Sequence, residues 1–349
     1  MNYILYDPED IENFYPFTLT RPLCEMRVFG GTIKEHWENY LGCSVSILTR
    51  DYLINLYPSN WKENGNILIN SKYLPTEDGS NDDLFQSFDN KVTLQVVQDH
   101  FSKHVFPKKD IKSLFSFQSN LDIISQFQTY NFSTKSNIDC SKNPLLDDKD
   151  GPIVIEDNVT IMPGVTIKGP VHICSGSTIK MGAKIYGPTV IGPHCKIGGE
   201  VSNCIFLGFS NKAHDGFLGH SIIGEWCNIG AGTSNSNLKN DYGNVKMWNY
   251  LSKKFKDSGQ QFLGLFMGDH TKCAINISFN TGTTIGVNCN IFGVGFPRNF
   301  IPSFSWGGSQ GLKQYDFNKA MIVAERVMSR RDCQLTQDYV SMLKFIHDM

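Results

Sequence analysis

A loop near the middle of the chain holds the residue types best suited to catalysis. It runs from Gly208 to Gly219 with the sequence GFSNKAHDGFLG, and its histidine is His214. Imidazole titrates close to physiological pH, so a neutral histidine can take the proton that an amine must lose before it attacks an electrophile. Hydrogen bonding within the loop is the alternative explanation for such a histidine. The sequence around His214 must decide between a catalytic and a structural role for this histidine.

The stretch ahead of this loop repeats every six residues. One row is Ile155, Ile161, Ile167, Ile173, Ile179, Ile185, Ile191 and Ile197, and a second row, four positions later, is Val159, Val165, Val171, Ser177, Ala183, Thr189, Cys195 and Val201. A period of six fits neither an α-helix nor the plain alternation of a strand. Stacked coils of strand and turn explain it, with Pro–Gly and Gly–Pro pairs at the corners. The sequence therefore predicts a parallel β-helix.

This repeat resembles that of the hexapeptide-repeat transferases. The resemblance implies a left-handed β-helix, which is an exception to the usual right-handed crossover. It also implies a homotrimer with active sites in the clefts between neighbouring β-helices. The repeat is interrupted after Val201 and resumes at Ile223 and Ile229, so the loop with His214 is expected to lie on the β-helix.

The loop and the segment after it resemble the acetyltransferase half of the bifunctional family that makes UDP-N-acetylglucosamine. The similar stretches are KAHDGFLG (212–219) and NIGAGT (228–233). By this resemblance His214 is the general base, while Asn228 and Asn237 bind the acceptor. The implied donor is acetyl-CoA, and the leading acceptors are amino sugars and amino-sugar 1-phosphates.

Other positions match this family less closely. Phe217 stands where this family has a tyrosine that contacts the substrate. The candidates for binding the phosphate of a sugar phosphate are Lys184 and Lys246. The residues expected along the acyl-CoA channel are Ala231, Gly232, Ala274, Gly293 and Arg298. A backbone amide near Ala274 or Gly293 is expected to stabilise the oxyanion, at ~3 kcal/mol per donor.

The N-terminal third reads as an α/β domain. Its predicted elements are strands at Tyr3–Tyr6, Val45–Thr49 and Ile67–Ile69 and a helix at Thr32–Tyr40. The run PFTLTRP (16–22), followed by Met26-Arg27-Val28 and then Gly30–His36, resembles the opening of sugar-nucleotidyltransferase domains. The whole arrangement resembles a divergent bacterial branch of the bifunctional family.

The predicted N-terminal domain departs from that family at its phosphate site. A glycine-rich loop should follow the first strand and cradle phosphates with its amides, but Leu5–Asp10 contains three acids and no glycine. Leu23 and Asn70 stand where a lysine and a magnesium-binding aspartate are expected. The prediction is a degenerate domain, with Mg²⁺ needed only if it is active. The weak candidates for ligand binding are Arg21, Glu25, Arg27 and Asn70, with a solvated ion-pair network as the alternative.

Length and composition set wider limits. A chain of 349 residues suggests two domains, and a net charge of −2 gives no electrostatic case for nucleic acid or an anionic membrane. Ten cysteines without CxxC pairs argue against zinc knuckles and a disulfide scaffold. The first residues lack the pattern of a signal peptide, and no apolar run reaches the ~20 residues that span a bilayer. A cytoplasmic protein is expected.

The predicted domain boundaries follow these patterns. They are 1–132 for the nucleotidyltransferase-like domain, 133–151 for a polar linker, 152–312 for the β-helix and 313–349 for a helical segment. Residues 249–266 are expected to form an inserted loop or arm. Phe317–Arg330 has the apolar spacing of an amphipathic helix.

Three classes of function follow from the sequence. The first is an acyl-CoA-dependent N-acyltransferase with His214 as its base. The second is a sugar-1-phosphate nucleotidyltransferase built on the N-terminal domain, and the third is a non-catalytic trimeric scaffold or sensor. A zinc hydratase would need three converging histidines, and no metal-ligand spacing is found among His194, His214, His220 and His270.

Overall fold

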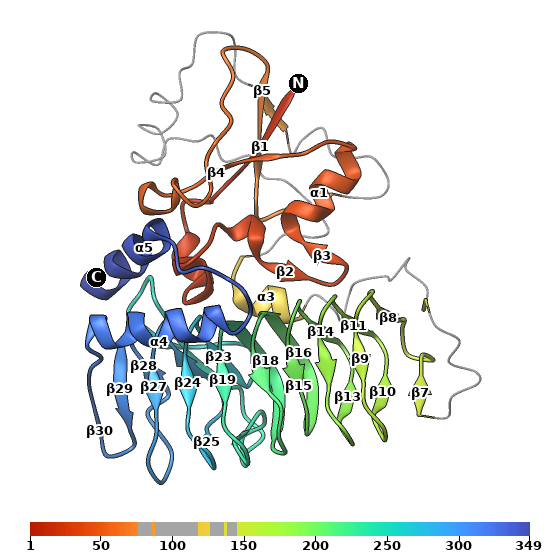
Figure 1. The fold of residues 1–349 in the computed structure, drawn as a ribbon, viewed down its shortest axis with the longest axis vertical. Helices are drawn as coiled ribbons and strands as arrows, with labels where there is room; N and C mark the ends of the chain where they lie inside the picture. Colours follow the sequence, from red (N-terminus) through yellow and green to blue (C-terminus); the bar gives the residue numbers. More distant parts are fainter. Residues whose placement is uncertain (76–84, 88–117, 126–135, 138–144) are drawn as a thin grey trace.

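The computed structural model describes residues 1–75, 85–87, 118–125, 136–137 and 145–349. Within them the chain forms an N-terminal α/β domain, a long left-handed parallel β-helix and two C-terminal helices, α4 (Phe317–Ser329) and α5 (Gln337–Asp348) (Figure 1). The predicted fold class is confirmed in both halves. No described helix is both long and apolar enough to cross a membrane.

The N-terminal domain is built on a small sheet with the strand order β4-β1-β5-β6. These strands are β1 (Asn2–Tyr6), β4 (Ser46–Leu48), β5 (Asn66–Asn70) and β6 (Phe85–Ser87). Around it lie β2 (Arg27–Val28), β3 (Gly31–Thr32), the helices α1 (Ile33–Leu41) and α3 (Asn120–Ser125), and the 3-10 helices η1 (Ile11–Phe14), η2 (Phe17–Leu19), η3 (Leu23–Glu25) and η4 (Asp51–Leu53). The predicted strands and helix are thus present within a residue or two of their expected ends.

Helix α1 forms where the sequence predicts it because both of its ends are capped. The Thr32 hydroxyl accepts the Glu35 N–H at 3.1 Å, and the Glu35 carboxylate accepts the Thr32 N–H at 2.6 Å. This reciprocal pair is a capping box. Gly42 then ends the helix in the left-handed conformation, at φ 65°, which costs glycine little.

Each coil of the β-helix has three short strands, so the β-helix has three faces. The first face contains β8 (Ile153–Ile155), β11 (Val171–Ile173), β14 (Thr189–Ile191), the second halves of β16 (Glu200–Gly208) and β18 (Phe217–Glu225), β23 (Leu265–Met267), β26 (Thr283–Ile285) and β28 (Phe300–Ile301). The second contains β7 (Leu146–Asp147), β10 (Thr166–Lys168), β13 (Lys184–Tyr186), the first halves of β16 and β18, β20 (Ser234–Asn235) and β25 (Ser278–Phe279). The third contains β9 (Thr160–Ile161), β12 (Thr178–Ile179), β15 (Lys196–Ile197), β17 (Asn211–Lys212), β19 (Asn228–Ile229), β24 (Lys272–Cys273), β27 (Asn290–Ile291), β29 (Ser305–Gly308) and β30 (Gly311–Gln314).

The two six-residue rows point into the coils, as the period predicts, and most of their residues are buried. Ser177 is polar but belongs inside, because its hydroxyl donates to the Gly192 carbonyl at 2.9 Å and so does not remain unpaired. Ile161 is the exception, at 39% exposed. It lies in β9, the end strand of the third face, and no described residues form a further coil over it.

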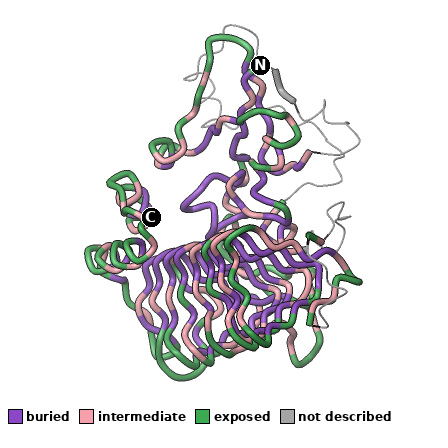
Figure 2. The backbone as a smooth tube through the Cα atoms, turned by 45° about the vertical axis from the view of Figure 1, so that its right-hand side comes forward, coloured by how far each residue is buried: buried purple, intermediate pink, exposed green. Residues whose placement is uncertain are grey.

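The N-terminal domain packs on the first face of the β-helix. One apolar cluster contains Leu5, Phe14 and Phe17 from the domain together with Ile222 and Phe266 from the β-helix. Phe17 and Phe266 lie with ring centroids 6.3 Å apart. Figure 2 shows the buried segments concentrated at this junction and inside the coils. The edge between the second and third faces therefore lies opposite the N-terminal domain.

The structure shifts the bounds of the predicted inserted arm and of the predicted linker. The expected arm at 249–266 begins slightly earlier, as a hairpin of β21 (Lys246–Asn249) and β22 (Lys254–Asp257). The expected linker at 133–151 lies partly outside the described residues, and its last part already pairs with the β-helix through β7 and β10. The predicted C-terminal helix is α4, which buries Ala320, Ala324 and Met328.

Candidate functional site

His214 lies in the exposed turn between β17 and β18, on the edge where the third face meets the second. We call this the His214 edge; its turns also contain Gly232, Ile275 and Val294 from later coils. Gly232 donates its N–H to the carbonyl of Asp215 at 2.9 Å, so successive turns of the edge are tied together. Among the described residues, no hydrogen bond is found to the His214 ring, which leaves it free to accept a proton.

A buried lysine that the sequence reading overlooked holds this turn in place. Lys212 points into the coil, where its ammonium donates to the carbonyls of Gly198 (3.0 Å) and His214 (2.8 Å). Burial lowers the pKa of Lys212 to about 8. Its position in the six-residue rows could have signalled this role, since Lys212 occupies an inward place that apolar residues fill in the preceding coils.

Replacement of Lys212 by methionine is expected to change how stability varies with pH. The folded-state pKa of about 8 lies below the ordinary value of 10.5, so between these values the unfolded chain binds more protons. The free energy of unfolding of the wild type, relative to that of Lys212→Met, should then rise with pH by up to about 1.4 kcal/mol per pH unit. Urea unfolding of both proteins at about pH 8 and about pH 10 measures this. If the two proteins differ in free energy of unfolding by the same amount at both pH values, the lowered pKa of Lys212 is contradicted.

The predicted acceptor-binding residues lie on both sides of the His214 edge. Asn228 is exposed on the third face, where its Oδ1 accepts from the Asn211 amide at 2.7 Å. Phe217 lies on the second face, where it is the register partner of Glu200 in the preceding coil. Glu200 in turn pairs with Lys184, so Lys184 lies two coils before Phe217 in the same row. Asn211 is a further polar residue of this surface that the sequence reading did not single out.

Asn237 lies at the far end of the second face, where the chain turns onto the first. Its Nδ2 is 2.9 Å from Nδ1 of His220, which stacks on Phe262. Burial lowers the pKa of His220 to about 4, so this ring is neutral and accepts the amide hydrogen. Lys246 is farther away: it lies on the hairpin, where its carbonyl faces Gly282. The structure does not bring Lys246 to the His214 edge.

The residues predicted to contact acyl-CoA follow the same edge. Ala231 and Gly232 lie in the next turn, and Gly293 and Arg298 lie in or beside later turns as exposed residues. The Ala274 N–H itself already donates to the Ile291 carbonyl at 2.8 Å, so an oxyanion donor near Ala274 would have to be another backbone amide. The Gly293 N–H has no partner in the described part of the chain, and a side chain at this position would meet no atom within 4 Å of its Cβ.

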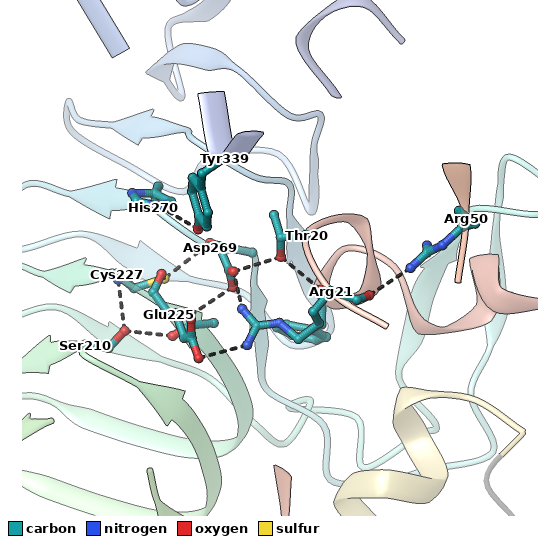
Figure 3. Close-up of polar contacts among 12 residues, drawn as sticks. Thr20, Arg21, Arg50, Ser210, Glu225, Cys227, Asp269, His270 and Tyr339 are labelled. Carbon is teal, nitrogen blue, oxygen red and sulfur yellow. Dashed lines mark hydrogen bonds and ion pairs between the residues drawn. The ribbon is translucent and has the colours of Figure 1, made fainter. Parts of the chain in front are cut away.

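Arg21, predicted as a weak ligand contact, instead joins the two domains (Figure 3). Its guanidinium pairs with Asp269 and, at 3.0 Å, with Glu225, both from the β-helix. The Thr20 hydroxyl adds a 2.8 Å hydrogen bond to the same Asp269 carboxylate. Burial alone would lower the pKa of Arg21, but the two carboxylates hold it well above the usual range.

The loop after β1 is occupied by the domain's own ion pairs. Asp7 is buried, accepts the Leu23 N–H at 2.7 Å and lies 3.3 Å from the Arg50 guanidinium. Asp10 pairs with the ammonium of Lys72 at 2.6 Å. These carboxylates occupy the end of β1 where a glycine loop would bind phosphate, and they neutralise the nearest cations. This supports the sequence-based view that the nucleotide site is degenerate.

Asn70 and Glu25 are also engaged within the N-terminal domain. Asn70 ends β5 and accepts the Lys72 N–H at 3.0 Å, so it shapes the turn after the strand. Burial raises the pKa of the Glu25 carboxyl. Neither residue meets the His214 edge, because both lie on the domain that covers the opposite face.

Glu156, His172 and Cys174 bring three potential metal-ligand atoms within 4.8 Å of one another. The Gly30 N–H donates to His172 Nδ1 at 3.2 Å, so Nε2 carries the ring proton and donates it to Glu156 at 2.7 Å. That hydrogen bond lowers the pKa of Glu156 to about 2. The protonated Nε2 offers no lone pair to a metal.

Arg27 lies beside the same cluster, with Nη1 3.6 Å from the Cys174 sulfur and 3.8 Å from Glu35. A polar pocket of about 460 Å³ opens next to it, between α1 and the first coils. Arg27 is thus partly engaged at the junction of the domains. Its positive charge also disfavours a cation at the neighbouring sulfur.

Comparison with known proteins gives two family matches. The model described as sugar nucleotidyl transferase matches residues 3–125. The model described as bacterial transferase hexapeptide (six repeats) matches residues 152–187. The first match lies in the N-terminal domain, and the second covers the first coils of the β-helix.

Curated relatives carry related descriptions. A bifunctional sugar-1-phosphate nucleotidylyltransferase/acetyltransferase from Sulfurisphaera tokodaii is 35% identical over 40% of this chain and 37% of its own length. Bifunctional proteins GlmU from Methanococcus aeolicus and Methanocaldococcus jannaschii are 34% and 39% identical, over 51% and 26% of this chain and 39% and 21% of theirs. The matched part is therefore less than two fifths of each relative's length. Over these parts the chain is similar to bifunctional GlmU-type proteins, and its match to the sugar nucleotidyl transferase model precedes its match to the hexapeptide repeat.

Proposed function

We propose that the protein is an acyl-CoA-dependent N-acyltransferase that acts on an amino sugar or an amino-sugar 1-phosphate. The observation that carries this proposal is the His214 turn, which is exposed, anchored from inside by Lys212 and flanked by asparagine side chains. A histidine that merely stabilised its loop would be expected to hydrogen-bond within it. In the described residues the ring of His214 makes no such bond.

The proposed reaction needs one base and one oxyanion donor. His214 takes a proton from the acceptor amine as the nitrogen attacks the thioester carbonyl. The developing oxyanion also requires a hydrogen-bond donor beside the thioester carbonyl. The Gly293 N–H lies three coils beyond His214 on the same edge, about 14 Å away at ~4.8 Å per coil, so within one chain it does not reach the same carbonyl. The intermediate collapses as the carbon–sulfur bond breaks, and the proton on His214 passes to the CoA thiolate. No covalent acyl-enzyme forms, so the buried cysteines have no part in the reaction.

A homotrimer would complete the proposed site. Four exposed apolar residues lie along or beside the His214 edge: Met181 (70%), Ile275 (65%), Val294 (85%) and Phe296 (58%). Such a row of apolar side chains favours burial against another surface. A second β-helix on this edge would supply the other wall of the cleft.

The nine described cysteines are free, which fits a reducing, cytoplasmic setting.

A thiol-release assay tests the proposal. Acetyl-CoA is presented with glucosamine, other amino sugars and their 1-phosphates, and oligomeric mass is measured in parallel. Release of CoA that depends on one acceptor supports the N-acyltransferase and names its substrate. Absence of turnover with every acceptor, in protein that is folded and trimeric, would remove this function and favour a scaffold or sensor.

Sugar-1-phosphate nucleotidyl transfer is the second candidate, because a sugar nucleotidyl transferase model matches the N-terminal domain. The acids at the end of β1 oppose it, since Asp7 and Asp10 occupy the expected phosphate site. We expect no Mg²⁺-dependent release of pyrophosphate from any nucleoside triphosphate with a sugar 1-phosphate. Acceptor-dependent pyrophosphate release would reverse that expectation and establish the second activity.

A further inference from the structure

Two lysines lie close together on the outer surface of the third face. Lys196 begins β15, and Lys180 follows directly after β12 in the preceding coil. Ile197 is buried in the coil, so its neighbours Lys196 and Gly198 point outward. A Cβ placed on Gly198 would lie 3.1 Å from the Cβ of Lys180, which locates both lysines on one patch of this face.

Helix α4 brings two arginines to the same patch. Its first turn lies at the last coil, where the rings of Phe317 and Phe304 have their centroids 6.0 Å apart. Figure 1 shows α4 lying along the coils. A helix of 13 residues is about 20 Å long, so it crosses about four coils at ~4.8 Å each. Arg330 and Arg331 follow its last residue and so lie at the coils of the two lysines.

The four cations Lys180, Lys196, Arg330 and Arg331 form what we call the Lys196 patch. None of them forms an ion pair with a carboxylate in the described part of the chain. The pKa of Lys196 is lowered, most strongly by the charge of Arg331 and then by burial, by Lys180 and by Arg330. The helix dipole explains why arginine is favoured at the end of α4, but it does not explain why two lysines face that end. Like charges held together in this way favour the binding of an anion between them.

The Lys196 patch lies near His214 but not beside it. Lys196 is the register partner of Asn211 in the next coil, and His214 follows Asn211 by three residues. One coil of ~4.8 Å and three residues of ~3.3 Å place the two Cα atoms about 11 Å apart. In a 2-amino sugar 1-phosphate, the amine and the phosphate are on neighbouring ring carbons and do not span that distance. The patch therefore suits the phosphates of a longer ligand whose reacting group lies at His214.

We propose that the Lys196 patch binds the phosphate groups of a ligand that extends along the third face to His214. A diphosphate suits it, because cations from the coils and cations from the end of α4 can contact the two phosphates from different sides. Two reactants could carry such groups: acyl-CoA, and a nucleoside diphosphate joined to the amino sugar. The choice of these two reactants rests on the acyl transfer proposed at His214, whereas binding of the anion does not.

Calorimetry with the full chain and inorganic pyrophosphate tests the anion site. The double variant Lys196→Gln/Arg331→Gln removes one cation from the coils and one from the end of α4. We expect it to weaken pyrophosphate binding about 10- to 100-fold, through the loss of charged hydrogen bonds. Lys313→Gln is the matched control, because Lys313 is an exposed lysine of the same sheet, in β30 at the other end of the β-helix. Lys313→Gln and His214→Ala should both bind pyrophosphate as wild type does.

Urea unfolding without added anion shows whether the double variant is intact. Its midpoint should equal or exceed that of wild type, because the substitutions relieve repulsion between like charges. The proposal is overturned if pyrophosphate does not bind at millimolar concentration, or if this folded variant binds it as tightly as wild type.

The affinities of the double variant for CoA and for uridine diphosphate identify the ligand. Weaker binding of CoA alone assigns the patch to the acyl donor, and weaker binding of uridine diphosphate alone assigns it to the acceptor. Weaker binding of both shows that the patch accepts either one, and unchanged binding of both overturns the proposal. A protein that binds pyrophosphate but releases no CoA with any acceptor would lose the proposed acyl transfer and keep the anion site.

Discussion

His214→Ala is expected to lower kcat for acyl transfer by about 10²- to 10⁴-fold, the usual contribution of a general base. The acceptor amine would have to lose its proton to water instead of to a positioned imidazole. The turn itself should keep its structure, because Lys212 holds it through the carbonyl of residue 214, which the substitution retains. Steady-state kinetics with saturating acetyl-CoA measure the loss.

Two further measurements separate a chemical role of His214 from a structural one. Added imidazole should restore part of the lost rate, since it can replace the missing base. The decline of kcat/KM toward low pH, expected when a general base is protonated, should be absent from the variant. Unfolding midpoint and oligomeric mass should match wild type. A variant that keeps more than a tenth of the wild-type rate would remove His214 from the proposed mechanism.

The largest effect on stability is expected from Asp269→Ala. Asp269 is fully buried and pairs with Arg21 across the domain junction, where the Thr20 hydroxyl and the Glu225 N–H also donate to it. Removal of one partner of a buried pair leaves the other charge without compensation and costs about 3–5 kcal/mol. Urea unfolding at neutral pH measures this loss, which should include separation of the N-terminal domain from the β-helix.

The double variant Arg21→Met/Asp269→Leu shows whether the charge itself is responsible. It removes both buried charges together and should recover much of the stability lost in Asp269→Ala. Asp241→Ala is the matched control, because Asp241 forms an exposed pair with Lys239, at 2.9 Å, and should change stability little. An Asp269→Ala protein as stable as the control would show that the apolar cluster alone holds the domains together.

Much of the architecture could be predicted because it depends on short-range patterns. The six-residue period predicts the β-helix, since each coil repeats the same inward positions and turns. Capping residues and apolar runs likewise predict α1 and the strands of the N-terminal domain. The insertion was also foreseen, because the period breaks where the β21–β22 hairpin now lies.

The candidate site could be predicted only in part. The sequence selected His214, Asn228 and Asn237, but it did not place Asn237 against His220 or Lys246 on a distant hairpin. Nor did it show that the Ala274 amide is already used within the β-helix. These outcomes depend on which backbone and side-chain groups meet from neighbouring coils, often 17 residues or more apart in the chain.

By itself, the sequence determined the repeating coil and the α/β character of the first third, and it singled out His214 as the candidate base. All of these follow from local spacing and residue type. Only the tertiary structure decided that Lys212 anchors the His214 turn, that Arg21 joins the domains and that Asp10, at the end of β1, pairs with Lys72. The physical reason is that a buried charge needs partners, and packing brings those partners from distant parts of the chain.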